Sequence, residues 1–243
     1  MSILARVTDV SGFSSDEKHG PLPALLIIPT IVTGLVDAVS YLELGRVFVA
    51  NMTGNVVFLG FAVAGAKEFS VPASLTAIAA FMLGALAGGR LGASVGHHRG
   101  RYLAIATCVK IALVGAALIT SVLARGTDDD PVRFGLIVLL ALAMGLQNVT
   151  ARRLGVPDLS TTVLTSTLAG LAADSALAGG KNANPGRRLV ATIAVLLGAA
   201  IGATLVFHVG PSAVLALVLV LLAVNAVAAY RTWSSSDAWT VGN

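Results

Sequence analysis

Charged residues are scarce in this chain. Asp, Glu, Lys and Arg make up 12% of its 243 residues, whereas soluble globular domains carry roughly 25%. Hydrophobic residues make up 56% of the chain, and the mean hydropathy is +0.87. This composition argues against a water-soluble enzyme or binding domain. We therefore expect an all-α integral membrane protein.

Cysteines and sequence motifs of catalysis are equally rare. Cys108 is the single cysteine, which excludes an internal disulfide, and its apolar neighbours predict a thiol packed in the core. No basic run with interleaved aromatics accompanies the net charge of +4, so we expect no nucleic-acid partner. No nucleophile elbow, phosphate loop, metal-binding helix pair or paired carboxylates are present. We therefore predict no enzyme activity, no metal site and no cofactor.

Eight apolar stretches follow one another with little polar sequence between them. They cover residues 23–42, 47–66, 73–93, 102–123, 133–150, 159–178, 189–207 and 211–230. Most approach the ~20 residues that a helix needs to cross hydrocarbon. We therefore predict one transmembrane domain at 23–230, flanked by disordered tails at 1–22 and 231–243.

The positions of lysine and arginine help to choose between eight crossings and six. Cytoplasmic loops of membrane proteins are enriched in these residues. If all eight stretches cross, Lys and Arg are divided rather evenly between the two sides of the membrane. If the stretches 47–66 and 159–178 dip in and return, most Lys and Arg fall on the side of the N-terminus. We favour six crossings with both termini in the cytoplasm, and eight crossings is the alternative.

A polar pattern occurs twice in the chain. The sequence GLVD at 34–37, followed by TGN at 53–55, is echoed about 111 residues later by GLQN at 145–148 and TST at 165–167. In each half, the second motif lies in one of the stretches expected to dip. The chain therefore looks duplicated around two polar interruptions.

Six crossings would make the two halves inverted repeats. Repeat one covers 23–123 and repeat two covers 133–230, and they would enter the membrane from opposite sides. Interrupted helices at corresponding positions of inverted repeats point to a binding site near the midplane. The expected fold is all-α, with about six full transmembrane helices and two interrupted or re-entrant helical segments.

Polar side chains in these stretches are the candidates for a solute pathway. An unsatisfied amide or hydroxyl in hydrocarbon is costly, so each needs a partner. The candidates for a substrate or ion pathway are Asp37, Asn51, Thr53, Asn55, Asn148, Thr165 and Thr167. The alternative interpretation is that these groups only hold helices together.

Two ionisable residues lie well within spans. Asp37 could carry a proton, bind a cation or anchor the interrupted segment by hydrogen bonds, and otherwise it is a hydrated residue near the helix end. Lys110 is either the partner of a carboxylate such as Asp37 or a snorkelling lysine. The counterpart of Asp37 in the second half is the neutral Asn148.

Glycines recur every four residues in the third and seventh stretches. Such stripes let helices approach closely and are a packing device. The predicted packing glycines are Gly84, Gly88, Gly92, Gly198 and Gly202. Because they hold corresponding positions in the two halves, they support the duplication, and we expect the two stretches to cross near the pseudo-symmetry axis.

Four parts of the chain resemble the YoaK family of bacterial inner-membrane proteins. They are GLVDA at 34–38, LGRVFVANMTGN at 44–55, GLQN at 145–148 and TTVLT at 161–165. The resemblance extends over about residues 23–230 and implies a multi-pass protein of the bacterial cytoplasmic membrane with about six spans. It supplies no substrate. Where the family often has a glycine after the second-half threonine, this chain has Ser166, which argues against a strict glycine hinge.

The favoured function is a small transporter or channel. The two interrupted segments would meet near the midplane and bind a small polar solute or an ion. The alternative is a membrane scaffold or sensor subunit that transports nothing and encloses no cavity. The expected partners are the lipid bilayer and the solute, and homo-oligomer formation stays open.

Overall fold

The computed structural model describes residues 19–124, 129–156, 164–180, 185–235 and 237–241. In these parts of the chain the secondary structure is helical, apart from turns and one isolated bridge. Six helices are long and apolar enough to cross a membrane. They are α2 (Leu22–Glu43), α4 (Val71–Val95), α5 (Arg99–Leu123), α6 (Asp130–Leu154), α8 (Pro185–His208) and α9 (Pro211–Tyr230). The protein is thus an all-α, multi-pass membrane protein.

Two shorter helices occupy the stretches that were expected to dip. Helix α3 covers Met52–Val63 and helix α7 covers Leu164–Ala173. At a rise of about 1.5 Å per residue, the 12 residues of α3 span about 18 Å, far less than the ~30 Å of a hydrocarbon core. Helix α7 has 10 residues and is shorter still. These lengths favour six crossings over eight.

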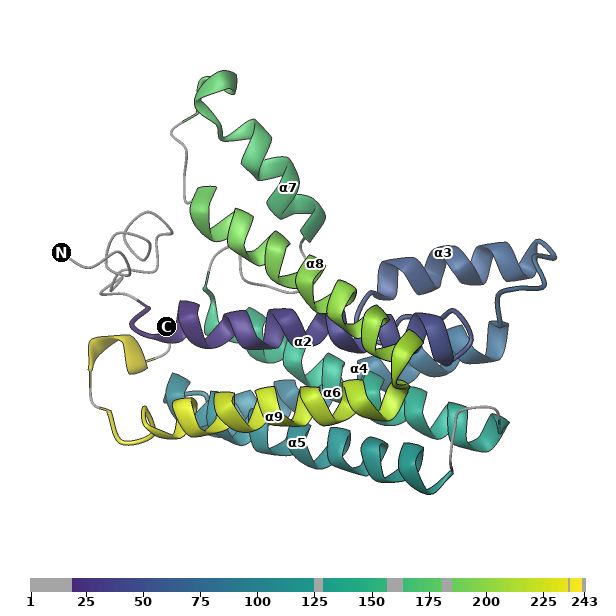
Figure 1. The fold of residues 1–243 in the computed structure, drawn as a ribbon. Helices are drawn as coiled ribbons and strands as arrows, with labels where there is room; N and C mark the ends of the chain where they lie inside the picture. Colours follow the sequence, from purple (N-terminus) through teal and green to yellow (C-terminus); the bar gives the residue numbers. More distant parts are fainter. Residues whose placement is uncertain (1–18, 125–128, 157–163, 181–184, 236, 242–243) are drawn as a thin grey trace.

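The long helices lie roughly along one direction, so their ends gather at two ends of a bundle (Figure 1). One end carries the starts of α2, α5 and α8 and the ends of α4, α6 and α9. Helix α3 leaves the middle of the bundle toward the opposite end, whereas α7 points back toward the first end and stands away from the bundle (Figure 1). The two short helices therefore run in opposite senses.

Two helix pairs form the centre of the bundle. Helix α4 packs along α6, and α2 packs along α8. Helices α5 and α9 lie against each other and against α6 and α2. The core between these helices is built from Val, Leu, Ile and Ala side chains, including Leu35, Val114, Leu140 and Leu222.

Glycines allow the two central pairs to come into backbone contact. A Cβ atom on Gly84 would lie 2.1 Å from the Leu142 carbonyl oxygen, and one on Gly198 would lie 2.2 Å from the Ile31 carbonyl oxygen. The stripes thus pack α4 against α6 and α8 against α2. The expectation that the two stripes cross at the pseudo-symmetry axis was wrong in its partners, because each stripe contacts the first helix of the other half.

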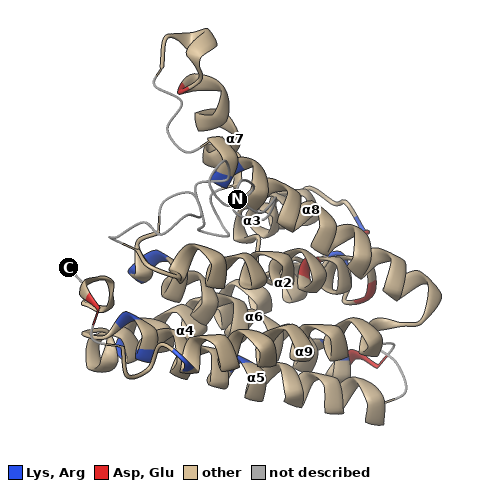
Figure 2. Ribbon diagram, turned by 60° about the vertical axis from the view of Figure 1, so that its left-hand side comes forward, with Lys and Arg blue, Asp and Glu red and all other residues tan. Residues whose placement is uncertain are grey.

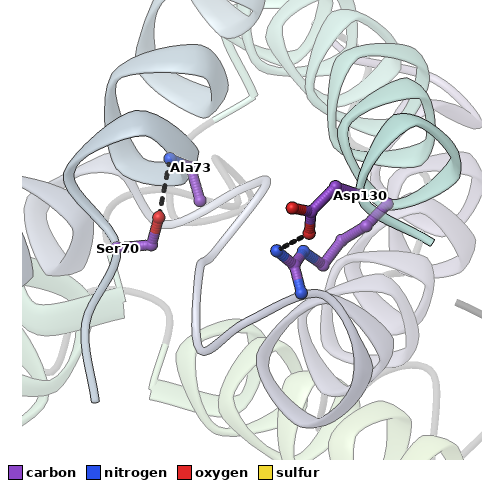
Figure 3. A network of polar contacts seen from close by, with 4 residues as sticks. Ser70, Ala73 and Asp130 are labelled. Carbon is purple, nitrogen blue, oxygen red and sulfur yellow. Dashed lines mark hydrogen bonds and ion pairs between the residues drawn. The ribbon is translucent and has the colours of Figure 1, made fainter. Parts of the chain in front are cut away.

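Helix starts follow ordinary capping chemistry. The Ser70 hydroxyl accepts a hydrogen bond from the Ala73 N–H at 3.3 Å and caps α4 (Figure 3). Asp130 begins α6 and forms an ion pair with Arg133, and its acidic side chain suits the positive end of the helix dipole. Figure 3 shows both contacts at the bundle end where α4 and α6 begin.

Basic residues gather at the other end of the bundle. Figure 2 shows most Lys and Arg near the C-terminus, and Asp130 belongs to the opposite end. The arginines at the helix ends on the basic side include Arg90, Arg99, Arg101, Arg152, Arg153 and Arg231. The charge asymmetry expected for a membrane protein is therefore present.

Two expectations about single segments were wrong. Cys108 is exposed on α5 and is not a packed core thiol. Residues 237–241 are not a disordered tail: Trp239 is 8% exposed, and its carbonyl accepts a hydrogen bond from Arg99 at 3.2 Å. A Cβ atom on Gly20 would lie 2.6 Å from the Trp239 ring. The end of the chain therefore packs over the start of α2, and residues 1–18 lie outside the described part.

Candidate functional site

The chain turns back into the bundle after α2. Gly45 and Arg46 have positive φ angles of 89° and 56° and make the turn, and Val47, Val49 and Ala50 are then buried without being helical. Ala50 reaches the level of Asp37, which is six residues before the end of α2. Six residues of helix rise about 9 Å. Helix α3 therefore begins inside the membrane-spanning part of the molecule.

Non-helical backbone at this depth needs hydrogen-bond partners that water cannot supply. Asp37 provides two of them, since its Oδ1 atom accepts from the N–H groups of Val49 at 3.2 Å and Ala50 at 2.9 Å. Asn55, at 0% exposure, provides two more. Its Oδ1 accepts from the Phe48 N–H at 2.8 Å, and its Nδ2 donates to the Phe48 carbonyl at 2.6 Å. These two side chains hold the turn-back segment in place.

Helix α3 is also pinned by close contacts. Asn51 caps its first turn, accepting from the Gly54 N–H at 3.4 Å. A Cβ atom on Gly54 would lie 2.7 Å from the Phe48 ring, so glycine is required for this approach. Five rings stack or tilt against one another around the helix: Tyr41, Phe48, Phe58, Phe61 and Phe69.

Helix α7 is the counterpart of α3 in the second half. Thr167 is its one buried residue, just as Asn55 is the one buried residue of α3. Helix α7 packs on α8, and Gly170 lies directly against the Arg188 guanidinium. Asp174, just beyond the helix, forms an ion pair with Arg188 at 2.7 Å. The residues between α6 and α7, 157–163, lie outside the described part of the chain.

A cavity of about 180 Å³ lies between the two interrupted segments. Ala50 and Asn51 line it from the first half, and Leu164 and Thr165 line it from the start of α7. Helices α2 and α8 complete its wall with Thr33, Asp37 and Val195. The starts of α3 and α7 therefore face the same space, together with one carboxyl group.

The cavity brings together three of the seven predicted pathway residues: Asp37, Asn51 and Thr165. Asn55 instead bonds the Phe48 backbone, and Thr167 is buried in α7. Thr53 is exposed on α3 and Asn148 is partly buried on α6, and neither lines the cavity. Among the open roles for Asp37, the structure shows the hydrogen-bond anchor and leaves the carboxyl group beside the cavity.

Lys110 takes neither of the roles expected for it. It is 1% exposed, so it does not snorkel, and its Nζ atom donates to Gln147 Oε1 at 3.2 Å. The Nε2 atom of Gln147 in turn donates to Thr33 Oγ1 and to the Pro29 carbonyl, both at 3.0 Å. This network ties α5 and α6 to α2 and ends at Thr33 in the cavity wall.

The sequence analysis overlooked Thr33 and the role of Gln147. Thr33 precedes Asp37 by four residues, and this spacing places both on one face of a helix. That spacing is the signal that could have identified Thr33. No comparable signal links Gln147 to Lys110, because their contact depends on how α5 and α6 pack.

Comparisons with known proteins agree with this architecture. Residues 25–228 match the model of a family described as protein of unknown function (DUF1275). The chain is also similar to the UPF0700 transmembrane protein YoaK of Bacillus subtilis (strain 168), with 37% identity over 151 residues. That match covers 62% of this chain and 65% of the relative, so it spans slightly less than two thirds of the relative's length. No solved structure matches the chain.

Proposed function

The chain belongs to the DUF1275 family, and from this premise we propose that it is a small-solute or ion transporter, or a channel, of the bacterial cytoplasmic membrane. The observation that carries the proposal is the cavity between the two interrupted segments, with Asp37 and Thr165 in its wall. A scaffold or sensor subunit would need only polar groups that satisfy one another. Asn55 meets that description, but the polar residues of the cavity wall enclose space.

Internal symmetry supports the proposal. The contact of Gly198 with Ile31 corresponds to that of Gly84 with Leu142, because Leu142 follows Ile31 by 111 residues and Gly198 follows Gly84 by 114. The contact of Gly202 with Leu35 corresponds in the same way to that of Gly88 with Leu146. One rule of correspondence therefore reproduces both contacts of the stripes.

The reverse contacts obey the same rule. Gly34 lies against the Val195 carbonyl and Gly145 against the Phe81 carbonyl. Gly145 follows Gly34 by 111 residues, and Val195 follows Phe81 by 114. Helices α2 and α6 run in opposite directions (Figure 1), so the correspondence suits inverted repeats, the arrangement in which transporters place a site near the midplane.

The charge asymmetry supports an orientation. The basic end of the bundle would face the cytoplasm under the positive-inside rule, which places both ends of the chain there. Single cysteines at Lys67 and Arg152, both exposed, test this in a Cys108→Ala background. A membrane-impermeant thiol reagent added to intact cells should label position 67 and spare position 152. Labelling of both positions from outside would contradict this topology.

The transport proposal is tested with purified protein in liposomes and a panel of ions and small polar metabolites. A bulky side chain in the cavity should stop any flux, so Val195→Trp is the test variant. Leu196→Trp is the matched control, because Leu196 is 65% exposed on the outer face of α8. Flux that Val195→Trp abolishes and Leu196→Trp preserves supports the proposal. Absence of flux across the panel, or equal flux in both variants, would count against it.

A further inference from the structure

The charge in the cavity wall narrows the class of ligand. Asp37 is the ionisable residue that lines the cavity. Within the described residues, no Lys or Arg forms an ion pair with it, and its printed partners are the N–H groups of Val49 and Ala50. Both of these bonds go to Oδ1. The second carboxyl oxygen is therefore not used to hold the turn-back segment.

Thr33 adds an oxygen to the same wall. Its hydroxyl donates to the Pro29 carbonyl at 3.0 Å and accepts from Gln147 Nε2 at 3.0 Å. A hydroxyl has one hydrogen and two lone pairs, so what Thr33 has left to offer is an acceptor. Lys110 fixes this arrangement, because its bond to Oε1 turns the nitrogen of Gln147 toward Thr33.

The helix starts facing the cavity do not reverse this preference. A helix N-terminus carries about half an elementary positive charge and would attract an anion. At α3, however, the Asn51 side chain already accepts from the Gly54 N–H, and Asp37 accepts from two N–H groups just before the helix. The full negative charge of a carboxylate in the wall outweighs the remaining partial charge.

We propose that this cavity binds a small monovalent cation, either an alkali ion or a protonated amine, with Asp37 as the counter-charge and Thr33 and Thr165 as further oxygen ligands. The inference rests on the proposed function and names its substrate class. The size of the cavity, about 180 Å³, suits a hydrated alkali ion or a small organic ammonium. Oxygen ligands from carboxylates and hydroxyls are typical of sites for hard cations.

Binding can be measured without transport. Full-length protein in nanodiscs is titrated calorimetrically with sodium, potassium, ammonium and methylammonium chloride, and N-methylglucamine chloride serves as the bulky-cation control. Asp37→Asn removes the charge while keeping an oxygen that can accept from Val49 and Ala50. We expect at least one small cation to bind and Asp37→Asn to weaken it about tenfold or more, which corresponds to about 1.4 kcal/mol. The sodium and methylammonium arms separate an alkali ion from an amine.

A second variant guards against misfolding of Asp37→Asn. Thr165→Val changes the opposite wall of the cavity and should weaken cation binding severalfold, whereas Thr204→Val, at an exposed position of α8, should leave it unchanged. No binding beyond the N-methylglucamine control, or equal binding by wild type, Asp37→Asn and Thr165→Val, would overturn the inference. If a neutral solute showed flux sensitive to Val195→Trp, the transporter proposal would stand without the cation. Cation binding that requires Asp37 but is accompanied by no flux would leave the inference standing without the transporter.

Discussion

The two short helices beside the cavity are held in the molecule in very different ways. Four hydrogen bonds from Asp37 and Asn55 fix the segment that leads into α3. The aromatic cluster around Phe58 then packs α3 and its neighbouring turns together. Each of these contacts lies within residues 37–69, so the first half of the site is assembled locally.

Helix α7 lacks most of these supports. Its sequence, LTSTLAGLAA, contains no aromatic residue, and the position that corresponds to Asp37 is Asn148. The side-chain links that hold it are the packing of Gly170 against Arg188 and the ion pair of Arg188 with Asp174. Among the described residues of α7, only Thr167 is buried.

This difference suggests a division of labour between the halves. Segments with few buried contacts open at low free-energy cost, and moving elements of proteins are drawn from them. We infer that α3 is the fixed wall of the cavity and that α7 is the wall that adjusts. A duplicated sequence would thus have kept the geometry of both halves and strengthened only one of them.

The largest expected effect comes from the buried residue of each short helix. Asn55→Ala leaves the Phe48 N–H and carbonyl without their present partners inside the bundle. Because an unsatisfied buried polar group costs about 1–3 kcal/mol, we expect a loss of about 3 kcal/mol in the free energy of unfolding. Thr167→Ala should cost about 1 kcal/mol or less. Reversible unfolding in detergent, or steric trapping in bicelles, would measure both.

Thr53→Ala is the control on the same helix, because Thr53 is exposed. Its free energy of unfolding should stay within about 0.5 kcal/mol of wild type. Equal losses for Asn55→Ala and Thr167→Ala would contradict the view that the first half is the more firmly held.

A pair of glycines within α3 gives an intermediate effect of opposite signs. Gly54→Ala places a methyl group against the Phe48 ring, and overpacking of this kind costs about 1–3 kcal/mol. Gly60 has open space around its Cα hydrogen, so Gly60→Ala should stabilise the helix by up to about 1 kcal/mol. Thermal melting of the two variants checks the signs. Stabilisation by both substitutions would show that the contact with Phe48 does not constrain α3.

Much of the fold could be predicted from hydropathy because a transmembrane span is a long, uniform signal. The stretch 73–93 became α4 at Val71–Val95, and 211–230 became α9 at Pro211–Tyr230. Uniform apolarity also explains the failure at Cys108, because nothing in such a span distinguishes the lipid-facing side from the core. Trp239 was missed for another reason: its contact with Gly20 joins the two ends of the chain, and no local pattern announces it.

The candidate site was predictable in its residues more than in its contacts. Asp37 and Asn51 stood out because polar groups are rare in apolar stretches, and both line the cavity. The partner of Lys110 was wrong because the sequence suggested pairing by charge, whereas the fold places the neutral Gln147 beside it. Thr53 and Thr165 hold similar sequence positions, yet only Thr165 lines the cavity, since facing depends on how each half-helix is rotated.

The smallest expected effect on stability comes from the ion pair that ties the end of α7 to α8. Arg188→Gln removes a contact to Asp174, whose side chain is 48% exposed, so we expect the free energy of unfolding to fall by less than about 1 kcal/mol. The local effect should be clearer. Hydrogen exchange of the amides in α7 should accelerate, while exchange in α3 stays unchanged.

Asp174→Asn should reproduce this local effect, because it breaks the same ion pair from the other side and leaves the packing of Arg188 on Gly170 in place. If Arg188→Gln accelerates exchange and Asp174→Asn does not, the packing holds α7 and the ion pair is incidental. If neither variant changes exchange in α7, the helix is fixed by its contact with α8 alone. The contrast between a fixed and an adjustable wall would then lose its physical basis, because both short helices would be held by the interior of the bundle.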